Sequence, residues 1–421
     1  MKTVSFYTLG CKVNSYDTAY MRQLFLRSGY TAVDFEQPAD IAVVNTCTVT
    51  AVADKKSRAA IRRAAKHSKV IVAGCMAQKQ AQELLRLDEV GAVIGTDERS
   101  AIVNVAERLL AGEAHIDATH GLEGCGYEPM SLSEPGERTR GVIKIQEGCN
   151  NFCSYCIIPY VRGRSRSRSL ESILYEAESL AQSGVKELVL TGIHIASYSD
   201  GGRGLADVIR ELGGLGGVRV RLGSIEPGLL DEEFVRQAAE TKNLCPHFHL
   251  SLQSGSGTVL RRMNRKYTPD EYYRFAKLLR KYFDKPAITT DIIAGFPGET
   301  QHEHNETMDF VEKTEFSRVH VFPFSPREGT KAYDMQPKVP KHIARQRANE
   351  LIALGNACEK KYIEGLIGLN AHVLFEDESK VYPGCLEGYS ERYVRVAASA
   401  RPGELKAVTL TVVKDTVAYG V

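Results

Sequence analysis

Short apolar, β-branched runs alternate with helical patterns along most of the 421 residues of this chain. In the first part of the chain, four such runs lie at residues 4–9, 41–46, 70–73 and 92–94. Strands that alternate with helices are typical of a mostly parallel sheet covered by helices. The sequence therefore predicts an N-terminal α/β domain over residues 1–112.

The alternation pauses over residues 113–139, a segment rich in Gly, Pro, Ser and Glu that we expect to be a linker. It then resumes with longer helical segments between the strands. The candidate strands lie at residues 142–146, 187–190, 218–222, 248–252, 288–293 and 319–322. A full (β/α)8 barrel takes about 250 residues. Six units therefore predict a partial (β/α)6 barrel over residues 140–366, closed by a long helix.

The last segment of the chain, residues 367–421, has a different pattern. Its β-branched, alternating runs are separated by turns that contain Gly and Pro, which indicates short strands joined by tight connections. We expect a small antiparallel β-barrel here. The predicted fold class is thus α/β for the first two domains, followed by an all-β domain.

Composition excludes several classes of protein. Hydrophobic residues make up 43% of the chain and charged residues 25%, as in ordinary soluble globular proteins. No apolar stretch approaches the ~18 residues of a membrane-spanning helix, and the N-terminus lacks the pattern of a secretory signal. We therefore expect a cytoplasmic protein with no membrane partner. Because the net charge is only +2, any signal for nucleic-acid binding must be local.

The ten cysteines include one tight group, Cys149-x3-Cys153-x2-Cys156, placed just after a candidate strand of the barrel. In a reducing compartment, clustered cysteines indicate metal binding or catalysis rather than disulfides. Iron–sulfur clusters usually take four cysteines, so three leave one iron open to another ligand. A structural zinc site is the alternative, but it needs four closed ligands, and no fourth Cys or His is adjacent.

A second group of cysteines is dispersed along the chain. Cys11, Cys47 and Cys75 each stand at the carboxyl end of a candidate strand. In a parallel sheet these ends share one edge, so the three thiols are expected to converge there. The alternative is that they are small buried apolar residues placed there by chance, and the pattern alone does not separate the two interpretations. No ligand spacing links the other four cysteines, which are Cys125, Cys245, Cys358 and Cys385.

Several segments resemble one family. The segments around the dispersed cysteines, TLGCKVNSYDT, NTCTVTAVADKKSR and VAGCMAQ, resemble those of the methylthiotransferases. The segment KIQEGCNNFCSYCIIPYVRGRSRSR is similar to that family's radical S-adenosylmethionine (SAM) motif, and HLSLQSGS and DIIAGFPGET are similar to its later barrel segments. The tail with YSERYVRV is similar to the family's C-terminal TRAM domain. Among the subgroups, TLGCKVN with NTCTVT is most similar to the enzymes that modify N6-threonylcarbamoyladenosine in tRNA.

The resemblance implies both the cofactors and the reaction. The tight group, here called the radical SAM cysteines, would hold a [4Fe-4S] cluster that binds and cleaves SAM. The dispersed group, here called the auxiliary cysteines, would hold a second [4Fe-4S] cluster that carries the sulfur. A methylthio group would be transferred to C2 of the adenine on the 3′ side of the anticodon, with SAM as both methyl donor and radical source. The implied partners are the tRNA and a reductase or flavodoxin-type electron donor.

The strand ends of the predicted barrel carry the candidates to hold SAM, because active-site groups of such barrels lie there. These candidates are Gly192, Glu226, Gln253, Ser254 and Arg265. Each is alternatively an ordinary strand-end residue. His194 departs from the family's pattern, in which Asn is frequent at this strand end.

Local basic stretches are the candidates for tRNA binding, because clustered guanidinium groups suit a phosphate backbone. One stretch follows the radical SAM cysteines and consists of Arg162, Arg164, Arg166 and Arg168. The alternative for this stretch is ion pairing within the fold. Small β-barrels also bind RNA by stacking, and the candidates in the last domain are Arg392, Tyr393 and Arg395.

Three competing functions stay open at this point. The nearest is the same reaction on isopentenyladenosine in tRNA or on an aspartate of a ribosomal protein. The second is an iron–sulfur electron carrier that binds RNA, which would need neither six β/α units nor an open iron. The third is a zinc-stabilised RNA-binding scaffold.

Overall fold

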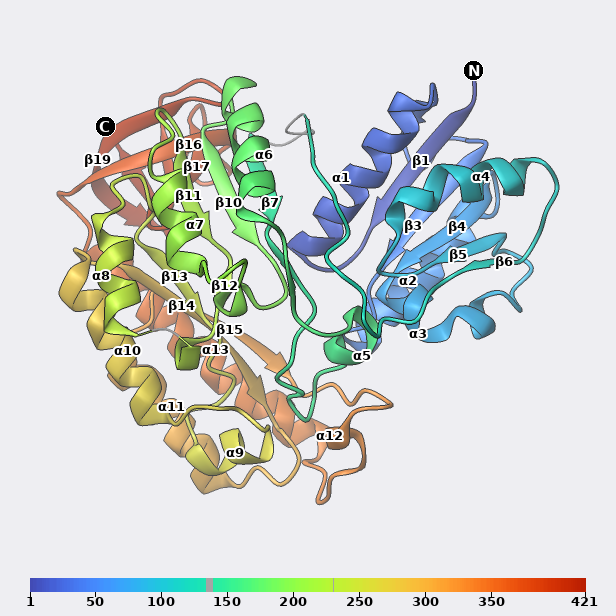
Figure 1. The fold of residues 1–421 in the computed structure, drawn as a ribbon. Helices are drawn as coiled ribbons and strands as arrows, with labels where there is room; N and C mark the ends of the chain where they lie inside the picture. The colour runs from blue at the N-terminus through green and yellow to red at the C-terminus, as the bar shows by residue number, and fades with distance from the viewer. Residues whose placement is uncertain (134–138, 230) are drawn as a thin grey trace.

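The computed structural model describes residues 1–133, 139–229 and 231–421. Its N-terminal part is a six-stranded parallel sheet in the order β2-β1-β3-β4-β5-β6 (Figure 1). The strands are β1 (Thr3–Thr8), β2 (Thr31–Val33), β3 (Ile41–Thr46), β4 (Lys69–Gly74), β5 (Ala92–Ile94) and β6 (Ile116–Ala118). The helices are α1 (Lys12–Arg27), α2 (Ala51–Ala64), α3 (Cys75–Leu84) and α4 (Ile102–Leu110). The predicted parallel α/β architecture is confirmed.

Successive side chains of β3 point to opposite faces of this sheet. Ile41 and Val43 pack with α1 and α4, whereas Ala42 and Val44 pack with α2 and α3. Because both faces are covered, residues 41–44 of β3 form a continuous apolar run rather than an alternating pattern. The parallel register pairs the last residue of β3, Thr46, with the last residue of β4. The residues that follow these strands are therefore brought to one edge of the sheet.

The central part is a partial barrel whose strands form two parallel sheets, β7-β10-β11 and β12-β13-β14-β15. The two sheets meet at Gly223, whose N–H donates to Leu190 O at 2.8 Å. A Cβ at Gly223 would lie only 2.8 Å from that same oxygen, so the close approach requires glycine. The strands are β7 (Arg140–Lys144), β10 (Glu187–Thr191), β11 (Arg219–Leu222), β12 (Ser224–Ile225), β13 (His247–Leu250), β14 (Ala287–Ala294) and β15 (Arg318–Pro323). With β11 and β12 as two halves of one position, the expected six strand positions are present.

Helices cover the outside of this barrel. The long ones are α6 (Leu170–Gln182), α7 (Leu205–Leu212), α8 (Glu232–Glu240), α10 (Pro269–Tyr282), α11 (Gln301–Thr314) and α13 (Lys341–Glu364). Shorter elements are α5 (Ile158–Arg162), α9 (Gly257–Arg262), α12 (Lys331–Asp334) and the hairpin of β8 (Gln146–Glu147) with β9 (Arg166–Ser167). In the described part of the chain, no helix has the length and apolar content to span a bilayer.

The C-terminal part is a closed five-stranded barrel in the order β16-β17-β18-β20-β19. Its strands are β16 (Asn370–Glu378), β17 (Leu386–Ser390), β18 (Arg395–Ala398), β19 (Leu405–Lys414) and β20 (Val417–Gly420). Four of the five pairings are antiparallel, as expected, but β18 and β20 run parallel. A ring with an odd number of strands cannot alternate direction throughout, so closure forces one parallel pair.

The segment 113–139, expected to be a linker, contributes to the N-terminal domain. It contains β6, which extends the N-terminal sheet beside β5. Farther along, Met130 and Leu132 are buried against Tyr16 and Tyr20 of α1. The composition of the segment gave no sign of this packing, because its apolar residues find their partners far away in the sequence. Residues 134–138 of the expected linker lie outside the described residues.

Glu187 joins the central barrel to the C-terminal one. Its buried carboxylate accepts from Arg219 Nε at 2.6 Å and from Arg221 Nε at 2.9 Å. The same two guanidinium groups donate to backbone carbonyls of the C-terminal barrel, among them Tyr389 O at 2.8 Å and Ser390 O at 3.0 Å. One carboxylate therefore holds two arginines that bridge the domains.

The variant Glu187→Gln is expected to lower the free energy of unfolding by about 3–5 kcal/mol, the usual cost of removing one partner of a buried charge pair. Chemical denaturation measures this change. Glu211→Gln is the matched control, because Glu211 also pairs with an arginine, Arg210 at 3.3 Å, but lies at the surface. The control should change stability by no more than about 0.5 kcal/mol. Equal changes in the two variants would contradict the assigned role of Glu187.

The same site predicts a pH dependence. Burial alone would raise the pKa of Glu187, but Arg221, Arg219 and Arg140 outweigh it and hold the pKa below its ordinary value. A carboxyl with a lowered folded pKa contributes its full stability above the unfolded value of about 4.3, and the contribution is lost as the pH falls below it. Wild-type stability should therefore drop between about pH 5 and pH 3 more steeply than that of Glu187→Gln.

Candidate active site

The radical SAM cysteines lie in the loop between β8 and α5, beyond the carboxyl end of β7. At Gly148, the start of this loop passes close to the backbone of Arg164, and a Cβ there would lie 2.0 Å from Arg164 O. The φ of Gly148 is +70°, so both the close approach and the backbone conformation favour glycine. Asn264 fixes the loop from the other side, where its Nδ2 donates to Asn151 O at 3.2 Å and Phe152 O at 3.0 Å. The three cysteines are thus held on a rigid loop at the strand ends of the barrel.

The sulfur atoms of this loop face hydrogen-bond donors. The backbone N–H of Asn151 donates to Cys149 Sγ at 3.5 Å, and Arg265 Nη1 donates to Cys153 Sγ at 3.4 Å. Burial raises the pKa of the Cys149 thiol and raises the pKa of the Cys156 thiol to about 12. Such thiols become thiolates when a metal coordinates them, and the nearby donors then stabilise the negative charge. This donor set fits an anionic iron–sulfur cluster.

Two of the predicted SAM-binding residues converge beside this loop. Glu226, directly after β12, forms an ion pair with Arg265 at 3.3 Å. Its carboxylate also accepts from Asn151 Nδ2 at 2.8 Å and lies 3.4 Å from His194 Nε2. Sequence reasoning did not select Asn151, although its place inside the cysteine motif was a signal. His194, noted above as unusual, belongs to the same buried polar group.

The other three predicted SAM-binding residues have different surroundings. Gly192 allows a close approach, because a Cβ there would lie 2.9 Å from Gln146 O. Gln253 extends the sheet with its backbone, donating to Asp291 O at 2.8 Å. Ser254 Oγ lies 3.2 Å from Thr307 Oγ1 and accepts from the N–H of Ser256, so its hydroxyl has partners within the fold.

The auxiliary cysteines lie together at the carboxyl edge of the N-terminal sheet. Cys11 follows β1, Cys47 follows β3 and Cys75 follows β4, three adjacent strands. Asn14 ties the strand ends together, because its Nδ2 donates to Leu9 O at 2.7 Å and Thr46 O at 2.9 Å. Convergence of the three thiols was expected from the topology, and the structure places them at this common edge.

The local backbone suits an anionic group at this edge. Cys11 is the N-cap residue of α1 and Cys75 is the first residue of α3, so both thiols lie at helix N-termini. Helix N-termini favour negative charge and lower the cost of forming a thiolate. Burial acts in the opposite direction and raises the pKa of Cys75 to about 11. Cys11 is exposed, which leaves one side of the group accessible.

In the three described ranges, no three His, Cys, Asp or Glu side chains are placed to hold a single metal ion.

The two cysteine groups are joined by residues 157–162, which run from the radical SAM loop into α5. Ile157, the residue after Cys156, packs with Val161 against Cys75 in one small apolar cluster. Figure 1 shows α5 between the N-terminal sheet and the barrel. The auxiliary cysteine Cys75 therefore packs against the segment that directly follows the radical SAM cysteine Cys156.

Three of the four arginines in the predicted RNA-binding stretch lie inside the protein. The exposed fractions of Arg162, Arg166 and Arg168 are 0%, 8% and 2%. Arg162 pairs with Glu147 at 2.9 Å, and Arg168 pairs with Glu176. These buried side chains are not placed to reach a tRNA phosphate. Arg162 and Arg168 instead form ion pairs within the fold, the alternative given above for this stretch. Arg164 is exposed and its guanidinium lies 4.5 Å from the centre of the Phe152 ring.

The candidate RNA-binding residues of the C-terminal barrel mainly make contacts within the chain. Tyr393 stacks on His247 of the central barrel, with ring centres 4.8 Å apart. Arg392 donates to the carbonyl of Lys285, also in the central barrel, at 3.2 Å. Arg395 pairs with Glu387 at 2.6 Å. Tyr393 and Arg392 thus attach the C-terminal barrel to the central one. The short basic and aromatic run in the sequence does not indicate this contact between domains.

Comparison with known proteins agrees with this geometry. Residues 3–95 match the model of a family described as "Uncharacterized protein family UPF0004", and residues 143–311 match the radical SAM superfamily. A protein of Bacillus subtilis (strain 168) named threonylcarbamoyladenosine tRNA methylthiotransferase MtaB is 38% identical over 406 residues, covering 94% of this chain and 90% of that protein. This chain belongs to the radical SAM methylthiotransferase family. Membership implies a [4Fe-4S] cluster and SAM.

Other relatives of this methylthiotransferase extend the comparison. A Thermotoga maritima protein, also named threonylcarbamoyladenosine tRNA methylthiotransferase MtaB, is 38% identical over 413 residues, covering 94% of this chain and 91% of that protein. The tRNA-2-methylthio-N(6)-dimethylallyladenosine synthase of Bacillus pumilus is 32% identical, covering 91% of this chain and 78% of that protein. The solved structure of the radical SAM methyltransferase TsrM from Kitasatospora setae has a TM-score of 0.60 at 15% identity, covering 79% of this chain and 74% of that one. That likeness concerns the fold alone.

Proposed function

We propose that this methylthiotransferase transfers a methylthio group to C2 of N6-threonylcarbamoyladenosine in tRNA, on the 3′ side of the anticodon. The proposal rests on one observation above all, the packing of Cys75 against Ile157 and Val161 in the segment that directly follows Cys156. A reaction of this kind needs a site that generates a radical beside a site that holds the transferred sulfur. The choice of acceptor is supported by the B. subtilis and T. maritima relatives, whose names state that nucleoside.

The cofactors of this proposal are two [4Fe-4S] clusters and SAM. Cys149, Cys153 and Cys156 would ligate one cluster, and the auxiliary cysteines would ligate the other. When bound, these groups supply the electron that cleaves SAM and the sulfur that is transferred. The chain would supply the ligands and the donors to their sulfur atoms. SAM would serve as methyl donor and as radical source.

The remaining assignments follow from the geometry of the barrel mouth. Arg265, which contacts Cys153, and its ion-pair partner Glu226 would bind the amino-acid part of SAM, with Gly192 and Gln253 at neighbouring strand ends. Exposed Arg164, with Phe152 beneath it, is the candidate for contact with tRNA. A reductase or a flavodoxin-type protein would donate the electrons in the cytoplasm.

Nucleoside analysis of tRNA tests the acceptor. A strain that lacks its own methylthiotransferases is complemented with this chain, and its tRNA is digested and examined by mass spectrometry. We expect 2-methylthio-N6-threonylcarbamoyladenosine to appear, and the variant Cys149→Ala, the control, to give none. Appearance of the methylthio derivative of isopentenyladenosine instead would move the acceptor to that rival and contradict the proposal, as would modification of a ribosomal-protein aspartate without change in tRNA.

A further inference from the structure

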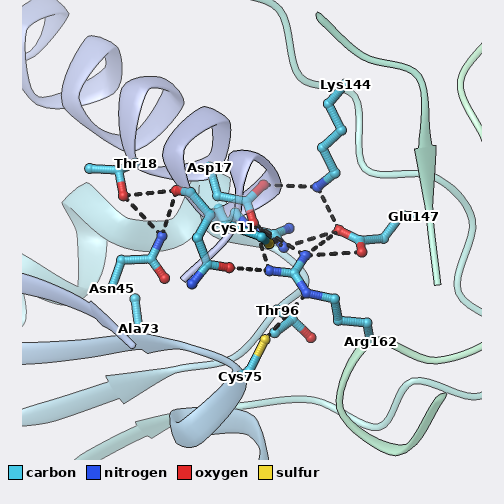
Figure 2. Close-up of polar contacts among 12 residues, drawn as sticks. Cys11, Asp17, Thr18, Asn45, Ala73, Cys75, Thr96, Lys144, Glu147 and Arg162 are labelled. Atoms are coloured by element: carbon cyan, nitrogen blue, oxygen red, sulfur yellow. Dashed lines mark hydrogen bonds and ion pairs between the residues drawn. The ribbon is translucent and has the colours of Figure 1, made fainter. Parts of the chain in front are cut away.

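Arg162 belongs to the barrel domain but its side chain ends in the N-terminal domain. It is the last residue of α5, six residues after Cys156, and its exposed fraction is 0%. Figure 2 shows its guanidinium among residues from α1, α3 and β8. None of the reaction steps considered so far uses this buried charge.

Two nitrogens of this guanidinium are fixed by oxygen atoms. Nη1 donates to both carboxylate oxygens of Glu147, at 3.0 and 2.9 Å, and lies 3.3 Å from Asp17 Oδ2. Nη2 also donates to Asp17 Oδ2 at 3.3 Å and to Asn14 Oδ1. A planar guanidinium held at two nitrogens has a fixed direction for the third.

The third nitrogen points to an auxiliary cysteine. Arg162 Nε lies 3.3 Å from Cys75 Sγ and donates to it (Figure 2). Through Asn14, which holds the carbonyls of Leu9 and Thr46, the same side chain is connected to the loops that carry the other two auxiliary cysteines. One residue of the barrel domain therefore contacts or supports all three ligand loops of the other domain.

We propose that Arg162 is a positioning residue of the auxiliary cluster. Its Nε donates a hydrogen bond to the Cys75 thiolate and so sets the reduction potential of that cluster. Because Arg162 belongs to the barrel domain, retention of the cluster depends on docking of the two domains. The inference rests on the proposed function, since it takes the auxiliary cysteines to hold a cluster. Hydrogen bonds to ligand sulfur and nearby positive charge set the potentials of iron–sulfur clusters. A cation beside the cluster stabilises its more negative, reduced form, so loss of the contact should make the potential more negative.

Arg99 provides a matched control. It is buried to a similar degree, with 3% exposed, and pairs with the same carboxylates, Asp17 at 3.0 Å and Glu147 at 3.4 Å. Within the described residues, the ion-pair partners of the Arg99 guanidinium are the carboxylates of Asp17, Glu128 and Glu147, not a sulfur atom. Arg162→Lys and Arg99→Lys therefore perturb the same ion-pair group and keep its charge, but only the first removes the donor to Cys75.

The experiment isolates the auxiliary cluster in the full-length chain. Cys149, Cys153 and Cys156 are replaced with alanine, and the reconstituted protein is compared with and without Arg162→Lys or Arg99→Lys. Iron content, the midpoint potential followed by electron paramagnetic resonance, and the rate of iron loss to a chelator are measured. We expect Arg162→Lys to give a more negative midpoint potential and about tenfold faster iron loss, and Arg99→Lys to leave both unchanged.

Each outcome decides the inference. Equal potentials and equal iron loss in the Arg162→Lys, Arg99→Lys and unsubstituted proteins would overturn it while leaving the proposed function intact. A parent triple variant that binds no iron would overturn the auxiliary cluster and the inference together. If Arg162→Lys does not fold, the double variant Arg162→Gln/Glu147→Gln replaces it, because that variant removes one charge of each sign. The same shift of the midpoint potential to a more negative value is expected.

Discussion

Replacement of Cys153 with alanine is expected to slow SAM cleavage by more than about 100-fold, because loss of a ligand should exceed the usual 10- to 100-fold cost of losing a residue that supports one. Cys153 Sγ accepts from Arg265 Nη1 at 3.4 Å, and Arg265 pairs with Glu226 at 3.3 Å. On the proposed assignment, the substitution removes a cluster ligand and leaves that guanidinium without its sulfur partner. The assay is 5′-deoxyadenosine release under reducing, anaerobic conditions, with iron measured in the same sample. Iron should fall from about eight toward about four per chain.

Cys245→Ala is the control for this substitution. Cys245 is also buried, with 1% exposed, but belongs to neither cysteine group. Burial raises the pKa of Cys245 to about 11, so this residue is a neutral thiol at physiological pH. The control variant should keep its iron and its SAM cleavage. A Cys153→Ala protein that cleaves SAM at the wild-type rate would contradict the assignment of the radical SAM cysteines.

Replacement of Cys75 with alanine is expected to have a different effect, loss of the methylthio product without loss of SAM cleavage. Cys75 lies in the N-terminal domain, where it packs against Ile157 and Val161 but is not part of the radical SAM loop. Its removal should destroy the auxiliary site and leave the loop on the barrel intact. Methylthio product should fall by more than about 100-fold, whereas 5′-deoxyadenosine should still form, as read by mass spectrometry of the same reaction.

Cys125→Ala is the corresponding control, because Cys125 lies outside both cysteine groups; its Sγ donates to backbone carbonyls, such as Gly121 O at 3.2 Å. This variant should form product at the wild-type rate. If Cys75→Ala also forms product at that rate, the auxiliary site is not the source of the transferred sulfur. If Cys75→Ala loses SAM cleavage as well, the two sites are not separable in the way proposed.

Much of the fold was predictable because its signals are local. The β-branched runs of the N-terminal domain gave the parallel sheet, and the rule that parallel strands share a carboxyl edge placed Cys11, Cys47 and Cys75 together. The short spacing of the radical SAM cysteines, just after a candidate strand, likewise identified their loop from the sequence. These features depend on residues close in sequence or on a general property of parallel sheets.

The roles of the arginines were less predictable because their partners are remote. Arg162 and Asp17 are 145 residues apart in the sequence yet pair inside the protein. Tyr393 stacks on His247, which belongs to another domain. A run of basic residues indicates charge, but whether that charge faces RNA or a buried carboxylate depends on how the domains pack. Asn151 and Glu226, 75 residues apart, illustrate the same limit within the barrel.

Reconstitution of the wild-type chain tests the central claim most directly. The protein is loaded with iron and sulfide under anaerobic conditions, then incubated with a reductant, SAM and tRNA that carries N6-threonylcarbamoyladenosine. We predict about eight irons per chain, as two four-iron clusters require, together with 5′-deoxyadenosine and the 2-methylthio nucleoside. Zinc in place of iron, with no cleavage of SAM, would contradict the account.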